Sequence, residues 1–530
     1  MGAARRSRHS TEHSAMKISR FRSFASIVVA ASTAPVLSAD VLDEIGYLDL
    51  AARLGSDMPT GAGVEVVQTE ALDPGYSPHQ GNGQFSGIDF IERSGATEPS
   101  LHASKVGFAF YGGTDGVAPG IPTVNLFEVN DFIGAGHLRY GSSSLPEDPP
   151  GAARIFNHSW IASGGPAVDI NVLRRADFAA NTFKTLWVVG VNNGAGSDSP
   201  PLLAGMHHGI SVGKADGDHA GADTGAGTEQ QGRMKPEIVA PGDFTSFATP
   251  VVSGCAALLY ETHDVTPGLA GNSIADLPQV IKAVLLAGAS RNESWTNNPE
   301  SKGGQRGSTS RPIDEVYGAG MVDIDRAHAI YTGLEQSGAA DGNPSSATMS
   351  GPGWDFESMS NGEVLWHRFS LDAVAEEVGI LVTWNRIVAA NFASATHPNL
   401  DLELLRIVDG VPVPLVGADA AFFASGNVRS SSDVDNVELI HVRGLAAGDY
   451  AVRLSRIDGS SVSTRAAIAW WIPPAAEFGP GDLNHDGRVD GADFGELLAR
   501  WGTSDPEADL DGSGSVAGGD IGVLLALWTG

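Results

Sequence analysis

The chain is short of cysteine, of basic residues and of long apolar runs. Its 530 residues include one cysteine, Cys255, so no disulfide forms within the chain, and we expect this thiol to be a small buried side chain. Lys and Arg number 33 against 63 Asp and Glu, a formal net charge of −30, which argues against nucleic acid or an anionic membrane as partner. Beyond residue 39 no run approaches the roughly 20 apolar residues that span a bilayer. A chain of this length predicts two or three domains.

The N-terminus carries a concentrated basic stretch. Six Lys or Arg residues lie within residues 5–22, and residues 24–34, which are mostly apolar or small, follow them. This order of basic, apolar and small residues is typical of a secretory signal. We therefore predict a signal peptide over residues 1–39, cleaved after Ala39, and a protein that is secreted to the extracellular medium or the cell surface.

Three regions follow, and they differ in sequence pattern. In residues 41–335, short β-branched runs alternate with helical patterns, which predicts an α/β fold with a parallel sheet. In residues 345–473 the helical periodicity disappears, and alternating apolar and polar runs between turn residues predict an antiparallel β-sandwich. Residues 480–530 form a small third module. The strands predicted for the second region are residues 364–371, 379–384, 400–407, 437–442, 450–457 and 466–472.

Two neighbouring motifs in the first region predict a nucleophile. Residues 235–242 read KPEIVAPG, and residues 245–254 read TSFATPVVSG. In the second motif a hydroxyl residue opens a helix of small residues, whose first N–H groups and positive dipole end favour developing negative charge. Ser246 is therefore the candidate nucleophile. Both motifs resemble those of the subtilisin-like serine peptidases (subtilases), K-P-D-I-x-A-P-G and G-T-S-x-A-x-P-x-V-x-G, with Phe244 in place of the glycine that opens the second pattern.

An activated serine needs a base and a carboxylate that orients the base, and the resemblance implies both. Residues 101–107, LHASKVG, resemble the family's H-G-T-H-V-A-G, and His102 is the expected base. Residues 61–70, GAGVEVVQTE, line up with G-x-G-V-x-V-A-V-I-D, so Glu70 stands in the place of the family's aspartate, at the carboxyl end of a predicted strand. The alternative is a different orienting carboxylate, such as Asp89.

Two further segments resemble the family's oxyanion and substrate-binding elements. Residues 187–194, WVVGVNNG, resemble a strand that ends in A-G-N-x-G, which implies Asn192 as a side-chain donor to the oxyanion; a plain Asn-Gly turn is the alternative. Residues 156–160, FNHSW, resemble the segment that pairs with an extended substrate strand through main-chain hydrogen bonds. This resemblance implies Ser159 and Trp160 as substrate-binding residues.

The third module repeats an acidic pattern at a period of 27 residues, and an apolar helical segment follows each copy. Hard oxygen ligands around a glycine-forced turn fit Ca²⁺. The repeat resembles dockerin modules, which implies a cohesin-like or cell-surface scaffold as partner; a plain structural calcium cap is the alternative. The predicted ligands are Asp482, Asn484, Asp486, Arg488 through its carbonyl, Asp490 and Asp493 in the first loop, and Asp509, Asp511, Ser513, Ser515 and Asp520 in the second.

These patterns together predict a subtilisin-like parallel α/β sheet with helices on both faces, an antiparallel β-sandwich and a small helical dockerin-like module. The sandwich resembles the pre-peptidase C-terminal and proprotein-convertase-like sandwiches of secreted peptidases. The predicted function is a secreted serine endopeptidase that cleaves polypeptides, in which Ser246 attacks, His102 moves the proton and Glu70 orients His102. Two alternatives stay open: a catalytically inactive subtilase fold kept for binding or attachment, and a hydrolase of non-peptide esters.

Overall fold

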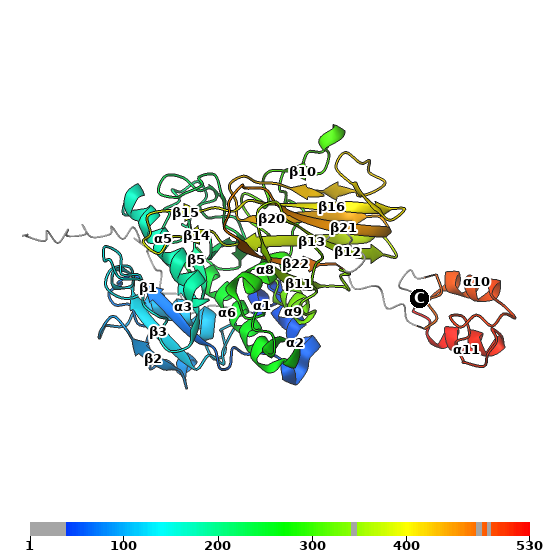
Figure 1. Cartoon of the computed structure of the whole chain (residues 1–530). Helices are drawn as coiled ribbons and strands as arrows, with labels where there is room; N and C mark the ends of the chain where they lie inside the picture. Colours follow the sequence, from blue (N-terminus) through cyan, green and yellow to red (C-terminus); the bar gives the residue numbers. More distant parts are fainter. Residues whose placement is uncertain (1–38, 341–346, 473–479, 485–488, 530) are drawn as a thin grey trace, which may run out of the picture.

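The computed structural model describes residues 39–340, 347–472, 480–484 and 489–529. Residues 1–38 of the predicted signal peptide lie outside the described residues, as do the predicted ligands Asp486 and Arg488. Figure 1 shows an α/β region in blue to green, a β-rich region in yellow and orange, and a small helical module in red.

The α/β region is built on a seven-stranded parallel sheet with the strand order β2–β3–β1–β4–β5–β6–β9. Its five central strands are buried almost throughout, as expected for a parallel sheet that is covered on both faces. The predicted parallel α/β fold is therefore confirmed. The strands are β1 (Glu65–Glu70), β2 (Asp89–Glu92), β3 (Thr123–Glu128), β4 (Ala153–His158), β5 (Leu186–Gly190), β6 (Ile210–Lys214) and β9 (Ile238–Ala240).

Two apolar clusters cover the two faces of this sheet. One face packs on α6 (Thr245–Val265), which also contacts α3 (Leu101–Tyr111), and the other face packs on α5 (Pro166–Phe183). Cys255 lies fully buried within α6, as predicted. The remaining helices of the region are α1 (Ala39–Glu44), α2 (Tyr47–Leu54), α4 (Val129–Ile133), α7 (Pro267–Ala270), α8 (Pro278–Gly288) and α9 (Ile324–Thr332).

A close approach fixes α6 beside the segment that follows α3. A Cβ atom added to Gly254 would lie 2.5 Å from Cβ of Val117, so only glycine fits at this point of the helix. Gly254 ends the motif that contains Ser246, and Val117 belongs to the GVAPG segment that follows His102. The two motifs that carry the candidate nucleophile and the candidate base are therefore packed directly against one another.

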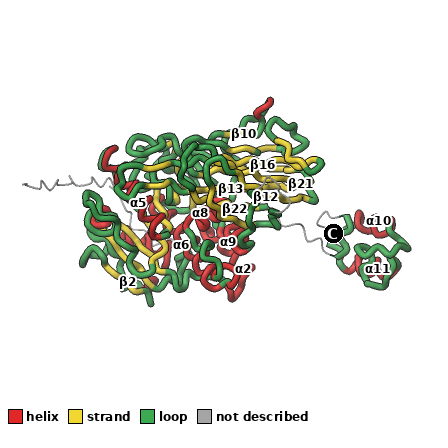
Figure 2. Tube along the Cα trace, viewed as in Figure 1, coloured by secondary structure: helices red, strands yellow, loops and turns green. Residues whose placement is uncertain are grey.

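Most strands of the β-rich region, shown in yellow in Figure 2, form two sheets that share a hydrophobic core. A further pair, β14 (Ile387–Val388) and β15 (Ala395–Thr396), forms a separate two-stranded sheet. Of the two larger sheets, one has the order β11–β22–β13–β20–β18, and the other has the order β10–β19–β16–β21–β12 with β17 paired to β16. Each of the six predicted runs falls on one of these strands, so the prediction of antiparallel sheets is confirmed. The strands are β10 (Ser308–Thr309), β11 (Gly353–Met359), β12 (Val364–Leu371), β13 (Ala375–Trp384), β16 (Leu400–Val408), β17 (Val411–Pro414), β18 (Ser425–Gly426), β19 (Arg429–Ser430), β20 (Val437–Leu445), β21 (Gly448–Arg456) and β22 (Thr464–Trp471).

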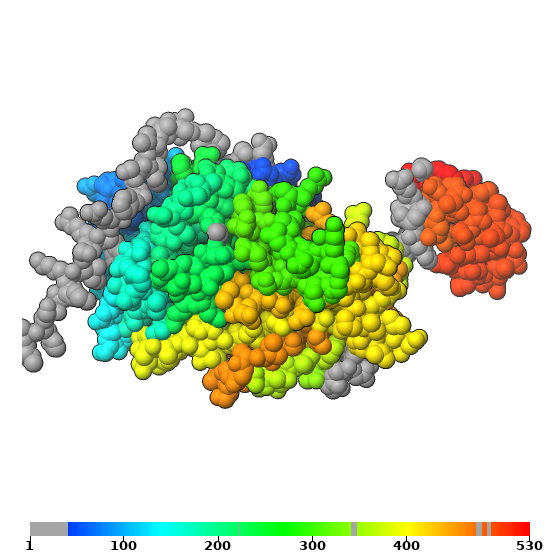
Figure 3. All heavy atoms as spheres, turned by 90° about the horizontal axis from the view of Figure 1, so that it is seen from above, coloured from blue at the N-terminus to red at the C-terminus, as the bar shows by residue number. Residues whose placement is uncertain are grey.

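The β-rich region packs directly on the α/β region, and Figure 3 shows the two in continuous contact. Trp354 and Leu381 belong to the same buried cluster as α8 and α9, and β10, which precedes residue 335 in the chain, joins the second sheet by pairing in parallel with β19. A buried ion pair also crosses the boundary, because Nε of Arg386 lies 2.7 Å from Oδ2 of Asp177 on α5. The two regions therefore form one packed unit.

The C-terminal module has a small core of its own. Two helices, α10 (Gly491–Ala499) and α11 (Gly518–Ala526), contact each other around buried apolar side chains such as Leu497 and Leu524. Figures 1 and 3 draw this module apart from the rest of the protein. Within the described part of the chain, no helix combines the length and the apolarity that crossing a membrane requires.

Candidate active site

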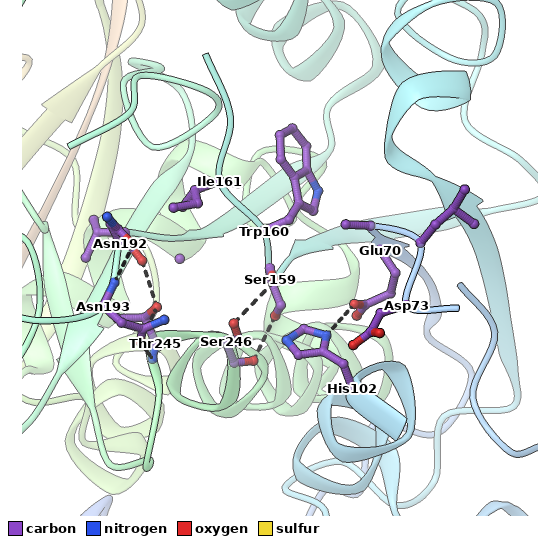
Figure 4. Close-up of a pocket in the computed structure, with 14 residues that line it drawn as sticks. Glu70, Asp73, His102, Ser159, Trp160, Ile161, Asn192, Asn193, Thr245 and Ser246 are labelled. Atoms are coloured by element: carbon purple, nitrogen blue, oxygen red, sulfur yellow. Dashed lines mark hydrogen bonds and ion pairs between the residues drawn. The ribbon is translucent and has the colours of Figure 1, made fainter. Parts of the chain in front are cut away.

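The carboxyl ends of β1, β4 and β5 meet the first turns of α3 and α6 around one pocket. Its volume is about 220 Å³. Open parallel sheets place their sites at this edge, because the strand ends and the helix N-termini converge there. The lining includes every candidate side chain of the first region: Glu70, His102, Ser159, Trp160, Asn192 and Ser246 (Figure 4).

Glu70 and His102 are in direct contact. Nδ1 of the imidazole lies 2.7 Å from Oε2 of Glu70, whose side chain is 1% exposed. Burial lowers the pKa of His102, but the charge and hydrogen bond of Glu70, together with the charge of Asp73, raise it, so the pKa lies above its usual value of 6.5. Asp89, the alternative acid, is exposed at the start of the edge strand β2 and does not line the pocket. Of these two acids, Glu70 is therefore the one in contact with this imidazole.

Ser246 is the second residue of α6 and lies on the other side of His102 from Glu70 (Figure 4). Its hydroxyl donates to the carbonyl oxygen of Ser159 at 3.3 Å, and the Ser159 hydroxyl donates to the carbonyl oxygen of Ser246 at 2.9 Å. As described, the hydroxyl of Ser246 makes no hydrogen bond to His102. The three side chains thus share one pocket, in which the hydroxyl of Ser246 is bound to the Ser159 carbonyl.

Phe244 fits its position without strain. Its backbone is extended, with φ −137° and ψ 155°, which any residue adopts, so the turn before Ser246 has no need of glycine. The Phe244 ring packs edge-on against Phe247 with the ring centroids 5.8 Å apart, and Phe247 lies 5.7 Å from the His102 ring. The substitution therefore builds an aromatic wall beside the imidazole and leaves the start of the helix undistorted.

The two asparagines after β5 have different contacts. Nδ2 of Asn192 donates to the carbonyl oxygen of Asp198 at 2.9 Å. Oδ1 of Asn193 accepts from the N–H of Thr245 at 2.8 Å and from the Thr245 hydroxyl at 3.1 Å, directly before Ser246. Both residues line the pocket. One of the two side-chain N–H groups of Asn192 is thus engaged by Asp198, whereas Asn193 is held at the start of α6 through its Oδ1.

Ser159 and Trp160 follow β4 and form another wall of the pocket. Trp160 is only 7% exposed, and its ring packs edge-on against His158 at 5.7 Å. Burial lowers the pKa of both His158 and His137 to about 3, so both imidazoles are neutral at pH 7. This wall therefore offers an apolar, uncharged surface beside Ser246.

In the C-terminal module the second acidic loop draws three carboxylates together. One carboxylate oxygen each of Asp509, Asp511 and Asp520 lies within 4.8 Å of the others. Oδ1 of Asp509 accepts from the N–H of Ser513 at 2.9 Å, and the Ser513 hydroxyl donates to the carbonyl oxygen of Ser515 at 3.2 Å. Several hard oxygen donors in one tight loop are the ligand set that Ca²⁺ prefers.

The first loop is described only in part. Oδ1 of Asp493 accepts from the N–H groups of Leu483 and Asn484, and its Oδ2 accepts from the N–H of Asp490. Asp520 binds the N–H groups of Asp511 and Ala517 in the same manner at the equivalent place of the second loop. The described parts of the two loops thus share this arrangement of hydrogen bonds. The predicted ligand Asp482 directly precedes Leu483 in the first loop.

Sequence patterns missed two side chains that belong to this site. Gln68 donates through Nε2 to Oε1 of Glu70 at 2.8 Å, and Asn193 binds Thr245. Gln68 left a signal, because it is a polar residue where the family pattern has valine, two positions before Glu70. The sequence pattern gives no reason to expect Asn193 and not Asn192 to contact α6, because the conformation of the turn decides which side chain faces that helix.

Comparisons with known proteins agree with the family suggested by the motifs. Residues 138–320 match the model of the subtilase family, peptidase S8. A curated relative is the serine protease/ABC transporter B family protein tagA of Dictyostelium discoideum, 26% identical over 258 residues, which are 44% of this chain and 14% of that protein. This chain thus spans a small part of the length of that relative.

Solved structures similar to this chain include the prenylagaramide maturation protease PagA, at 21% identity with a TM-score of 0.34, covering 52% of this chain and 97% of that one. A cold-adapted subtilisin-like serine proteinase matches at 17% identity with a TM-score of 0.29, covering 44% of this chain and 85% of that one. The family model spans the strand before Asn193 and the motif around Ser246. Residues 138–320 of the α/β region thus correspond to a subtilase (peptidase S8) domain.

Proposed function

We propose that this protein is a secreted serine endopeptidase that hydrolyses polypeptides with Ser246, His102 and Glu70 as its catalytic triad. The observation that carries the proposal is the 2.7 Å contact between Nδ1 of His102 and Oε2 of Glu70, in a pocket that also holds Ser246 at the start of α6. A buried carboxylate that orients an imidazole beside a hydroxyl at a helix N-terminus is the arrangement that activates a serine.

The proton path follows from these contacts. Glu70 accepts from Nδ1–H of His102, which leaves Nε2 as the acceptor on the side of Ser246. Rotation about the Cα–Cβ bond of Ser246 moves its hydroxyl from the Ser159 carbonyl to Nε2. The hydroxyl then attacks the scissile carbonyl carbon while Nε2 takes its proton. The imidazolium gives this proton to the leaving amine as the C–N bond breaks. Water then attacks the acyl carbonyl while Nε2 takes a proton from it, and the imidazolium returns that proton to Oγ of Ser246 as the ester bond breaks.

The developing oxyanion needs donors beside Ser246, and we assign its side-chain donor to Asn193 in place of Asn192. Oδ1 of Asn193 is held by Thr245, so its Nδ2 remains for an acceptor in the pocket, whereas Nδ2 of Asn192 is bound to the Asp198 carbonyl. The N–H of Ser246 belongs to the first turn of α6, where helix N–H groups have no carbonyl partner within the helix. These two donors form the proposed oxyanion hole.

The substrate is proposed to bind as an extended strand along the segment after β4. Ser159 and Trp160 continue β4 into the pocket, so a polypeptide lying there pairs with main-chain groups and places a side chain against Trp160. The apolar surface of Trp160, backed by neutral His158, suits an uncharged side chain at this point.

The C-terminal module is proposed to bind Ca²⁺ through both loops. Asp509, Asp511 and Asp520 fit the ion by the nature and the closeness of their oxygens, with Ser513 and Ser515 in the same loop. The pairing of the two loops supports a dockerin-like module that attaches the enzyme to a cohesin-like or cell-surface scaffold. Ala517 replaces the ninth-position ligand of the second loop, so this loop is the weaker of the two.

The experiment is a comparison of substrates with the full chain. Turnover is measured on casein and on simple esters, for the parent protein, for Ser246→Ala and for Ser143→Ala, an exposed serine that serves as control. We expect casein cleavage that is lost only in Ser246→Ala. Cleavage of esters without casein cleavage would favour an esterase. Absence of both activities would favour the inactive binding fold.

A further inference from the structure

Two departures from the subtilase pattern lie two residues apart on β1. The family pattern G-x-G-V-x-V-A-V-I-D has valine at the position of Gln68 and aspartate at the position of Glu70. Side chains two residues apart on a strand project from the same face of the sheet. Gln68 and Glu70 therefore lie side by side on the face of the sheet that α3 covers, and both are at most 1% exposed.

The two carboxylate oxygens of Glu70 have different partners. Oε2 accepts from Nδ1 of His102 at 2.7 Å, and Oε1 accepts from Nε2 of Gln68 at 2.8 Å. The carboxylate is thus held at both oxygens, one by the imidazole that it orients and one by a neighbour on its own strand. With a valine at position 68, as in the family pattern, Oε1 loses this donor.

The amide of Gln68 is itself held in one orientation. Its Nε2 also donates to the carbonyl oxygen of Ala103 at 3.0 Å, and its Oε1 accepts from the hydroxyl of Tyr111. Glu70 and Ala103 present acceptors only, so the opposite orientation of the amide would set oxygen against oxygen at both contacts. Tyr111 is fully buried at the end of α3 and completes a chain of hydrogen bonds from Tyr111 through Gln68 and Glu70 to His102.

The hydrogen bond from Gln68 to Oε1 of Glu70 matters because glutamate has one more rotatable bond than aspartate. A longer carboxyl side chain reaches its partner in several conformations, and only one of them aims the carboxylate at Nδ1 of His102. A misplacement of about 1 Å in a catalytic group costs on the order of 100-fold in rate. A fixed donor at Oε1 selects the productive conformation before substrate binds.

We propose that Gln68 is a positioning residue, itself held by Tyr111. It fixes the longer Glu70 side chain against His102 and so allows a glutamate to act where the family pattern has aspartate. The proposal rests on the proposed peptidase function. It predicts that the effect of Gln68 on activity depends on Glu70, because the shorter aspartate does not need the hydrogen bond from Gln68 to keep its conformation.

The first test is a cycle of variants in the full chain: Gln68→Val, Glu70→Asp and both together, the last of which places the family's residues at these two positions. The readout is kcat/KM on casein-derived peptides. We expect Gln68→Val alone to lose about 10- to 100-fold. In the presence of Glu70→Asp the same change should leave kcat/KM unchanged or raise it. Equal losses in both backgrounds, or no loss in either, would overturn the proposal.

Two further variants separate positioning from folding. Thr69→Val changes a buried residue of the same strand on the opposite face of the sheet, and it should leave kcat/KM as in the parent. Tyr111→Phe removes only the hydroxyl that holds Gln68 and should lower kcat/KM in the same direction as Gln68→Val, by less. If Gln68→Val does not fold, Tyr111→Phe decides: a thermal midpoint close to that of the parent with unchanged kcat/KM overturns the proposal.

A measurement that does not depend on turnover separates the positioning role of Gln68 from the peptidase function. The His102 imidazole is titrated by NMR in the parent and in Gln68→Val, with its signal assigned by its absence in His102→Gln. We expect a lower pKa in Gln68→Val, because Glu70 is no longer held against the imidazole. An unchanged pKa overturns the positioning role. A shifted pKa in a protein without hydrolytic activity supports the positioning role while the proposed function fails.

Discussion

The imidazole of His102 lies between two kinds of neighbour: the Glu70 carboxylate, 2.7 Å from Nδ1, and the aromatic ring of Phe247, 5.7 Å from the imidazole centroid. The carboxylate favours the charged imidazole, and burial favours the neutral one. Their balance sets the pH at which His102 becomes a base, and it places the pKa of His102 above its usual value of 6.5.

The pH dependence of activity should follow this pKa. The base is the neutral imidazole, so kcat/KM rises with pH through the pKa of His102 and reaches half its maximum above pH 6.5. In Glu70→Gln the carboxylate no longer favours the imidazolium, so the midpoint moves to lower pH and the plateau falls by about 10³- to 10⁴-fold. Profiles of kcat/KM against pH for both proteins check this, with Glu65→Gln at the far end of β1 as control. A midpoint that stays in place would contradict the role of Glu70.

The two asparagines after β5 should differ in their effect on turnover. Removal of a side-chain oxyanion donor from a subtilisin lowers kcat by about 10²- to 10³-fold. We expect a loss of that size in Asn193→Ala and a much smaller one in Asn192→Ala, because Nδ2 of Asn192 is bound to the Asp198 carbonyl. Values of kcat at saturating substrate decide between them. The reverse ranking would return the oxyanion role to Asn192.

The α/β region should not fold without the β-rich region. Trp354 and Leu381 complete the core around α8 and α9, and a chain that ends at residue 340 would expose this core and leave Asp177 without Arg386. Removing one partner of a buried ion pair costs about 3–5 kcal/mol by itself. We expect chain 39–472 to show a cooperative thermal transition by circular dichroism and chain 39–340 to show none. A cooperative transition in the shorter chain would contradict the shared core.

Calcium should bind to the C-terminal module, and it should do so through the acidic loops. We expect Asp509→Ala to lose one of two bound ions, because three gathered carboxylates become two. Calorimetric titration of the calcium-free full chain measures the number of ions, and Glu496→Gln, an exposed acid on α10, serves as control. Equal stoichiometry in Asp509→Ala and the parent would rule out the second loop as a site.

The sequence alone predicted those parts of the fold that periodicity determines. Alternating apolar residues placed the strand at 364–371, which is the whole of β12, and the subtilase motifs placed Glu70 beside His102. The pairing of Asp177 with Arg386 could not be predicted, because the two residues are 209 positions apart and no local pattern relates them. The signal peptide and the dockerin-like nature of the module remain predictions.

The conformation of the turns around Ser246 likewise could not be predicted from the sequence. Phe244 stands where the family pattern has glycine, and its extended backbone accommodates any residue. The choice between Asn192 and Asn193 likewise depends on which side chain the turn aims at Thr245. Such choices follow from backbone angles, which tertiary packing sets.

The most direct test of the proposed triad is covalent labelling of the purified protein with a fluorophosphonate, followed by identification of the modified residue by mass spectrometry. A triad of Ser246, His102 and Glu70 predicts a single adduct on Ser246, whose rate of formation falls in His102→Gln and whose signal vanishes in Ser246→Ala. A protein that stays unlabelled while folded, or an adduct on another serine with Ser246 intact, would contradict it.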